Sequence, residues 1–243
     1  MAKEQNVRIC SYDIIYNKTH KVSSIYKYFQ QIAGDDLDAI GLTRQALLEK
    51  GIVFVLAKMK SVFYRPIFSY EELKLQSCHR RIKGASFIRD YVLSCNGEVV
   101  GEASSYWALI DINTRRLCRP SVIESSLNGA LELCSFEIDE RFSFPGDVDT
   151  ESYSYTVVFS DIDENCHMNN TRYPDICLDA LGLISDNEYV SEVRIDYLAE
   201  AKQGETLKVE HTKSEIDGSY YFSAQNVSTG VKCFDAIIKL GKF

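Results

Sequence analysis

Three side chains suited to acid–base chemistry stand close together in the second half of the chain, namely Asp163, Asn165 and His167. Their spacing is i, i+2 and i+4, so an extended segment would direct all three toward one face. A carboxylate beside an imidazole can activate water or supply a nucleophile, and an amide can orient a carbonyl group. The segment from Asp163 to His167 is therefore a candidate site for hydrolytic chemistry.

The residues that follow predict the start of a helix. Asn169, Asn170 and Thr171 are suitable N-cap residues, and Pro174 fits a first helical turn. The free N–H groups and positive dipole end of such a helix can stabilise the oxyanion that forms when a carbonyl is attacked. A purely structural interpretation competes, because Asp and Asn are common in turns before helices and His167 would then be an ordinary surface residue.

Hydrophobic periodicity predicts the elements that position this segment. In the first half, a helix is expected over 20–40, ending at Gly41, and strands over 52–64, 71–82, 86–95 and 98–111. In the second half, strands are expected over 152–160, 190–197, 205–216, 219–228 and 230–240, with a helix over 171–184. Asn96-Gly97 and Asp217-Gly218 predict hairpins, and 119–150 has weak periodicity and is interpreted as a connector.

The order of one strand, one helix and four strands is expected twice, which indicates a duplication. Residues 12–19 align with 160–167 at an offset of 148, and residues 71–75 align with 205–209 at an offset of 134. In this alignment Ile15 replaces Asp163, Thr19 replaces His167 and Pro66 lies opposite Glu200. Only the second copy keeps the titratable set, so we expect the first copy to bind and the second to react.

The string SDIDENCHMNNTRY resembles the signature of the acyl-acyl-carrier-protein (acyl-ACP) thioesterases, which has the form D-x-N-x-H followed by two Asn and, two residues later, an aromatic residue. Three segments of the first half, RICSYDIIYN, VLAKMKSVFYRP and SSYWALIDINTRRLCRP, also resemble family segments. RIDYLAEA resembles the strand that carries a catalytic Glu. The resemblance implies catalytic roles for Asp163, Asn165, His167 and Glu200.

The resemblance also implies an α+β fold of two tandem hot-dog domains, each a long helix wrapped by a curved antiparallel sheet. We expect residues 1–120 to form a non-catalytic copy that binds the acyl chain, 121–150 to form a connector, and 151–243 to form the catalytic copy. Ala201 follows Glu200 where many plant members carry Cys, which excludes a Cys nucleophile at that place. No plastid transit segment is expected, because the chain resembles the bacterial branch of the family.

The cysteines and the other histidines are interpreted as structural. The eight cysteines form no C-x-x-C pair, which predicts reduced, mostly buried thiols rather than a zinc site, and no metal or cofactor is expected. Cys166 should point away from His167 in an extended segment, which disfavours a Cys–His nucleophile. The repeat suggests no carboxylate partner for His20 or His79, and His211 falls in a predicted strand.

The distribution of charge along the chain indicates which class of partner the protein binds. The net charge is −8, with 18 Lys and Arg against 12 Asp and Glu in residues 1–120, and 9 against 23 in the remainder. The acidic total argues against nucleic acid, and the positive first half suits an acidic partner. The resemblance implies an acyl carrier protein bearing a fatty acyl-phosphopantetheine. Candidate docking residues, which are equally interpretable as solvated hairpin charges, are Arg80, Arg81, Lys83, Arg115, Arg116 and Arg119.

No run of about 18 apolar residues predicts a membrane span, and the N-terminal segment lacks the apolar stretch of a secretory signal. A cytoplasmic location is therefore expected. A homodimer is left open, because two fused hot-dog domains already form the unit that single-domain relatives form by dimerising.

The resemblance implies hydrolysis of acyl-ACP to a free fatty acid and the carrier thiol, a step that ends chain elongation in fatty acid biosynthesis. Three alternatives stay open: an acyl-CoA thioesterase, a hot-dog protein that binds acyl thioesters without hydrolysing them, and a hot-dog dehydratase or hydratase. In the first hypothesis, Asp163 and Glu200 hold or deprotonate water, or Asp163 attacks directly to form a mixed anhydride. Asn165 would orient the reacting group, and His167 would protonate the leaving thiolate.

Overall fold

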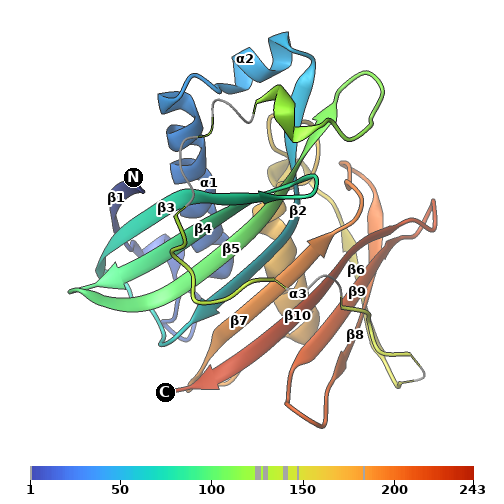
Figure 1. The fold of residues 1–243 in the computed structure, drawn as a ribbon. Coiled ribbons are helices and arrows are strands. Elements are labelled where there is room, and N and C mark those ends of the chain that lie inside the picture. Colours follow the sequence, from blue (N-terminus) through green and yellow to red (C-terminus); the bar gives the residue numbers. More distant parts are fainter. Residues whose placement is uncertain (1, 124–126, 128–130, 139–141, 147, 183) are drawn as a thin grey trace.

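The computed structural model describes residues 2–123, 127, 131–138, 142–146, 148–182 and 184–243. The strands of this described part form one ten-stranded antiparallel sheet in the order β1-β3-β4-β5-β2-β7-β10-β9-β8-β6 (Figure 1). The first half contains β1 (Lys3–Arg8), α1 (Val22–Ala39), α2 (Arg44–Glu49), β2 (Ile52–Phe63), β3 (Glu72–Lys83), β4 (Ser86–Cys95) and β5 (Glu98–Asp111). The second half contains β6 (Glu151–Thr156), α3 (Tyr173–Leu181), β7 (Glu188–Tyr197), β8 (Thr206–Lys213), β9 (Tyr220–Asn226) and β10 (Lys232–Lys242).

The strand order of the first half repeats in the second. From its outer edge inward, the first half runs β1-β3-β4-β5-β2, and the second half runs β6-β8-β9-β10-β7. The equivalent strands β2 and β7 pair antiparallel, with Lys60 opposite Arg194 at the centre of their ladder. This pairing makes the two sheets one surface related by a local two-fold axis.

Each half wraps its sheet around a helix. Figure 1 shows α1 and α3 on the same side of the sheet, behind the strands of their own halves. The helix α1 buries Val22, Ile25, Phe29 and Ile32, which recur at helical spacing and form one apolar stripe. Residues of α1, α3 and both sheet halves belong to one continuous apolar core. The expected α+β tandem hot-dog fold is therefore present.

The predicted elements agree with the observed ones within a few residues, with three exceptions. The short helix α2 was not predicted. The turn at Asn96-Gly97 is a two-residue hairpin with positive φ at both residues, but Asp217-Gly218 lies in a longer connection between Lys213 and Tyr220. The helix α3 is shorter than expected and ends at Leu181, because Gly182 has a φ of 76°. Residue 183 of that expected helix lies outside the described residues.

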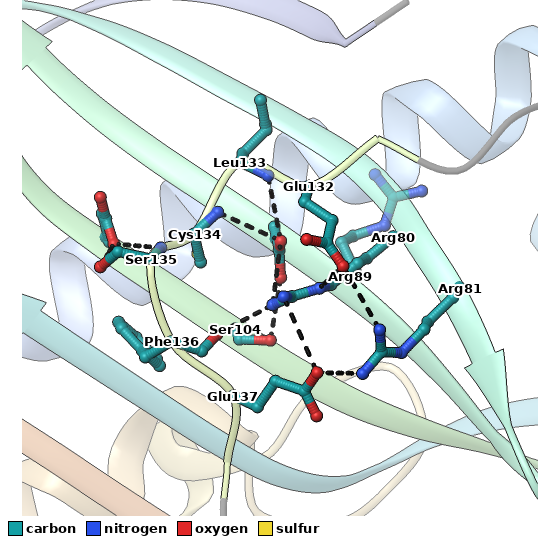
Figure 2. A network of polar contacts seen from close by, with 12 residues as sticks. Arg80, Arg81, Arg89, Ser104, Glu132, Leu133, Cys134, Ser135, Phe136 and Glu137 are labelled. Atoms are coloured by element: carbon teal, nitrogen blue, oxygen red, sulfur yellow. Dashed lines mark hydrogen bonds and ion pairs between the residues drawn. The ribbon is translucent and has the colours of Figure 1, made fainter.

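Part of the connector packs against the first half of the sheet. Residues 124–126, 128–130, 139–141 and 147 of the expected connector lie outside the described residues. The segment 131–138 crosses β3, β4 and β5 and is held by polar contacts, shown in Figure 2. The backbone N–H groups of Leu133 and Cys134 each donate to the buried Asp90 carboxylate at 3.2 Å. Arg80 donates to the Phe136 carbonyl oxygen at 2.8 Å.

Candidate active site

The segment from Asp163 to His167 is a tight turn rather than an extended strand. The Asp163 N–H donates to the His167 carbonyl at 3.0 Å, and Cys166 adopts a φ of 63°. The Asp163 side chain accepts the Asn165 N–H at 2.8 Å, which is the local bond by which Asp favours turns. The prediction of an extended segment, with side chains alternating between two faces, was therefore wrong. The turn nevertheless leaves Asp163, Asn165 and His167 at least partly accessible.

The tertiary structure brings His167 and Glu200 together. The His167 Nε2 atom lies 2.9 Å from Glu200 Oε2, and the two side chains are 20% and 40% exposed. Glu200 follows the end of β7, and the Met168 N–H donates to the Ala201 carbonyl at 2.8 Å. This backbone bond ties the turn to the β7 end beside the pair. A carboxylate bonded to an imidazole fixes the imidazole orientation and stabilises its protonated form.

Tyr173 lies close to the same carboxylates. It is the first residue of α3 and is almost fully buried against the rings of Tyr197 and Phe234. Burial is the main cause that raises the pKa of Tyr173, and Cys233, Glu200 and Asp163 raise it further. Both site carboxylates therefore lie within electrostatic reach of a neutral phenol. The sequence pattern contains this aromatic residue after the Asn pair, but the pattern alone predicts no role for it.

Two arginines of the first half reach the site in the second half. Arg44, at the start of α2, donates from Nη2 to the Asn165 Oδ1 atom at 3.1 Å, and its Nε lies 3.1 Å from Glu164 Oε1. Arg115 Nη2 lies 3.5 Å from Glu200 Oε2. Arg44 could not be predicted from hydrophobic periodicity, because the six-residue helix α2 has too few turns to show a helical period.

The basic residues expected to dock a carrier have different environments. Arg80 is only 5% exposed and bonds Asp90, Glu132 and the connector backbone, so the expectation that it docks a partner was wrong. Figure 2 shows Arg80 and Arg81 facing Glu132 and Glu137 of the connector, which balance the charges of β3. Lys83 lies 3.7 Å from Glu137. Arg116 and Arg119 are exposed.

A mostly apolar cavity of about 180 Å³ lies between α1 and the sheet of the first half. Ala33, Gly34 and Leu37 of α1 line one side, and Phe54, Phe87 and Trp107 of the sheet are among the residues on the other. A smaller cavity of about 20 Å³ shares Gln30 and Trp107 with it and reaches Asn170 and Thr171, just before α3. The two cavities thus share part of their lining, and the smaller one extends to the residues that follow the His167 turn.

Most of the cysteines and two of the other histidines are buried. All eight cysteines are free, and five of them are buried. Cys166 is exposed in the turn, and Ala201 is fully buried behind Glu200. His20 and His211 are buried, and the His20 Nδ1 atom accepts the Ile67 N–H at 3.3 Å. Within the described ranges, no helix is long and apolar enough to cross a membrane.

Comparison with solved structures shows the same fold over the whole chain. An acyl-ACP thioesterase from Bacteroides thetaiotaomicron superposes with a TM-score of 0.86 and 19% identity, covering 99% of this chain and 98% of the other. The 12:0-ACP thioesterase from Umbellularia californica gives a TM-score of 0.87 with 15% identity, covering 100% and 98% of the two chains. At these identities the likeness establishes the fold.

Sequence relatives and family models give the family. Oleoyl-acyl carrier protein thioesterase 1 of Arabidopsis thaliana is 25% identical over 233 residues, which cover 86% of this chain and 63% of the relative. The palmitoyl-acyl carrier protein thioesterase of Cuphea hookeriana is 26% identical over 194 residues, covering 70% and 44%. The chain thus spans about three fifths or less of the length of these curated relatives. The model of the acyl-ACP thioesterase N-terminal domain matches residues 2–124 and that of the C-terminal domain matches residues 147–240, so the chain belongs to the acyl-ACP thioesterase family.

Proposed function

We propose that this protein hydrolyses the thioester bond of fatty acyl-ACP, releasing a free fatty acid and the carrier thiol. The observation that carries the proposal is the pair of His167 and Glu200, whose Nε2 and Oε2 atoms lie 2.9 Å apart beside the turn of Asp163 and Asn165. Family membership supplies the class of substrate. The first half has Thr19 and Pro66 at the aligned positions and offers no such pair.

In this proposal, Glu200 orients the His167 imidazole and His167 removes a proton from the attacking water. The water oxygen bonds to the thioester carbon, the C–S bond breaks, and His167 returns a proton to the departing sulfur. Asp163 shapes the turn and helps to hold the water, while Asn165 binds the carbonyl oxygen as negative charge develops on it.

Direct attack by Asp163 is the alternative route, with a mixed anhydride as the intermediate. Single turnover in ¹⁸O-labelled water tests it. Unlabelled fatty acid would exclude direct attack of water on the thioester carbon and would require the anhydride. Labelled fatty acid is the expected result, although water attack on the acyl carbon of an anhydride also gives it.

We further propose that residues 1–120 bind the acyl chain, that 121–150 connect the halves and that 151–243 carry catalysis. The apolar cavity between α1 and the sheet of the first half supports the first of these roles. Of the basic residues predicted to contact an acidic carrier protein, Lys83, Arg115, Arg116 and Arg119 are exposed and stay candidates. We place the reaction in the cytoplasm, where free thiols stay reduced. A homodimer is not needed to complete the site, because both halves belong to one chain.

The test is an assay of the purified protein with acyl-ACP substrates of graded chain length, following thiol release and free fatty acid together. We expect turnover by the wild type and a loss of kcat by at least about 100-fold in Glu200→Gln. Glu215→Gln is the matched control, because Glu215 is exposed and makes no side-chain contact with the described residues of the site. Binding of acyl-ACP without release of thiol would overturn the proposal in favour of a non-hydrolytic binding protein.

A further inference from the structure

We infer that Arg44 of the first half is a positioning residue, which fixes the orientation of the Asn165 amide so that its NH₂ group is presented to the thioester carbonyl. The inference rests on the proposed function and assigns a role in it to the other half of the molecule. In this role Arg44 orients the Asn165 amide and does not itself bind an anion.

In the contact between Arg44 and Asn165, Arg44 is the donor and the amide oxygen is the acceptor. Arg44 Nη2 donates to Asn165 Oδ1 at 3.1 Å. A guanidinium group has donors and no acceptor, so it can bond only the oxygen of an amide. The flipped amide would place an NH₂ group against a cation and lose the bond. The Asn165 NH₂ group is therefore directed away from Arg44, and no side chain or carbonyl in the described part of the chain accepts from it.

The local structure holds Arg44 in place. Thr43 caps α2, with its Oγ1 accepting the Ala46 N–H at 3.1 Å, and the buried Leu47 anchors the helix to the first half. The Nε atom of Arg44 lies 3.1 Å from Glu164 Oε1, next to Asn165 in the turn. Arg44 thus contacts two consecutive side chains of the turn. This arrangement restricts the guanidinium group more than a single exposed ion pair would.

The first half provides an internal reference. Asn17 occupies the position of Asn165 in the equivalent turn, but its Oδ1 accepts from the N–H and hydroxyl of Thr19, at 3.2 and 2.7 Å. Its NH₂ group donates to the carbonyls of Ser185 and Glu188, at 3.3 and 2.7 Å. Every polar atom of the Asn17 amide is therefore used inside the protein. Among the described residues, only Arg44 bonds the Asn165 amide, through its oxygen, which leaves both N–H donors for a ligand.

A free N–H donor suits the reaction, because the carbonyl oxygen of a thioester gains negative charge when water attacks it. Loss of one such donor typically lowers kcat by about 10²- to 10³-fold. A flipped amide would set its own oxygen against that charge. Loss of Arg44 lets the amide sample both orientations, so we expect a smaller effect, about 10-fold in kcat with little change in KM.

The test compares Arg44→Gln with Lys50→Gln in acyl-ACP hydrolysis. Lys50 is exposed at the end of the same helix, and its replacement removes the same charge away from the turn. We expect kcat to fall about 10-fold in Arg44→Gln only. Arg44→Lys should keep more of kcat than Arg44→Gln, because an ammonium group also bonds only the amide oxygen, whereas a Gln amide can bond either end.

A double-mutant cycle with Asn165→Ala separates positioning from an independent role. Once Asn165 is removed, Arg44→Gln should lower kcat by less than about 2-fold more. A full additional 10-fold loss, an effect on KM alone, or no effect in the single variant would each overturn the inference while leaving the proposed function intact. A wild type that binds acyl-ACP and releases no thiol would instead overturn the proposed function, and the inference with it.

Discussion

The two halves contain the same turn with different side chains. The Ile15 N–H donates to the Thr19 carbonyl at 2.9 Å, and the Asp163 N–H donates to the His167 carbonyl at 3.0 Å. A buried Asp precedes each turn. The Asp13 carboxylate accepts the Cys10 N–H, and the Asp161 carboxylate accepts the Val158 N–H, both at 2.9 Å. The backbone of the turn is thus independent of the titratable side chains. The second turn carries Asp163 and His167, and the first carries Ile15 and Thr19 at the same positions.

The surroundings of the two turns differ as much as their side chains. In the first half, Asn17 is buried and donates to backbone carbonyls of the second half, and Thr19 is fully buried. In the second half, Asn165 is exposed and contacts a charged side chain of the first half. Both turns therefore contact the opposite half, but Asn17 of the first turn is buried in that contact, whereas the side chain of Asn165 in the second stays exposed. The following variants test this division of roles.

The largest difference should appear at the paired positions 167 and 19. His167→Ala removes the proposed base, so we expect kcat for acyl-ACP hydrolysis to fall by about 10²- to 10⁴-fold with an unchanged melting temperature. Thr19→Ala should keep kcat within about 3-fold and lower the free energy of unfolding by about 1 kcal/mol, because a buried hydrogen bond is lost. Steady-state kinetics and denaturant unfolding measure the two effects. Equal losses of activity in both variants would contradict the comparison.

The paired residues Asn165 and Asn17 should also differ, with an effect on activity at Asn165 and an effect on stability at Asn17. Asn165→Ala is expected to lower kcat by about 10²-fold with little effect on stability, because its NH₂ group faces solvent. Asn17→Ala is expected to lower the free energy of unfolding by about 2–3 kcal/mol, because the carbonyls of Ser185 and Glu188 lose their donor in a buried interface. A stable Asn17→Ala protein with greatly reduced kcat would show that the first turn also takes part in the reaction.

The aligned positions 20 and 168 predict a difference in how stability depends on pH. His20 aligns with Met168, and burial lowers the pKa of His20 to about 4. Below the ordinary His value near 6.5, the unfolded chain takes up a proton that the folded protein does not, so stability falls as the pH falls. In His20→Met this contribution is absent. Between pH 7 and 5, we expect the wild type to lose about 2 kcal/mol relative to the variant in urea unfolding. Parallel stability curves would refute this role of His20.

The smallest expected effect concerns the difference between the helices α1 and α3. The helix α1 has 18 residues and α3 has 9, and only α1 lines the larger cavity. A Cβ atom added at Gly34 would meet nothing within 4 Å. Gly34→Leu should therefore fill the cavity and shift the preference of kcat/KM toward shorter acyl chains, by about 4-fold for each excluded methylene. Gly34→Ala is the control and should raise helix stability by about 0.5–1 kcal/mol. An unchanged chain-length profile in Gly34→Leu would place the acyl chain elsewhere.

Most of the secondary structure and the candidate catalytic segment could be predicted from local sequence patterns. Strands with alternating apolar residues and a helix with an apolar stripe are local patterns, so they could be located without knowledge of the fold. The repeat indicated the duplication and showed which half lacks the titratable residues. Glu200 depended on resemblance to a family, because no local pattern connects it with His167.

The contacts between these residues could not be predicted, because they depend on how distant segments of the chain pack together. The turn at Asp163 replaced the expected extended segment, because the Asp163 N–H bonds the His167 carbonyl and Cys166 adopts a positive φ, as Lys18 does in the first half. Arg44 contacts Asn165 in the candidate site, whereas Arg80 is buried against Asp90. The contact of Arg44 with Asn165 joins residues 121 positions apart, and that of Arg80 joins two strands with a distant connector. Periodicity describes neighbours along the chain, whereas burial and ion pairing depend on which distant segments pack together.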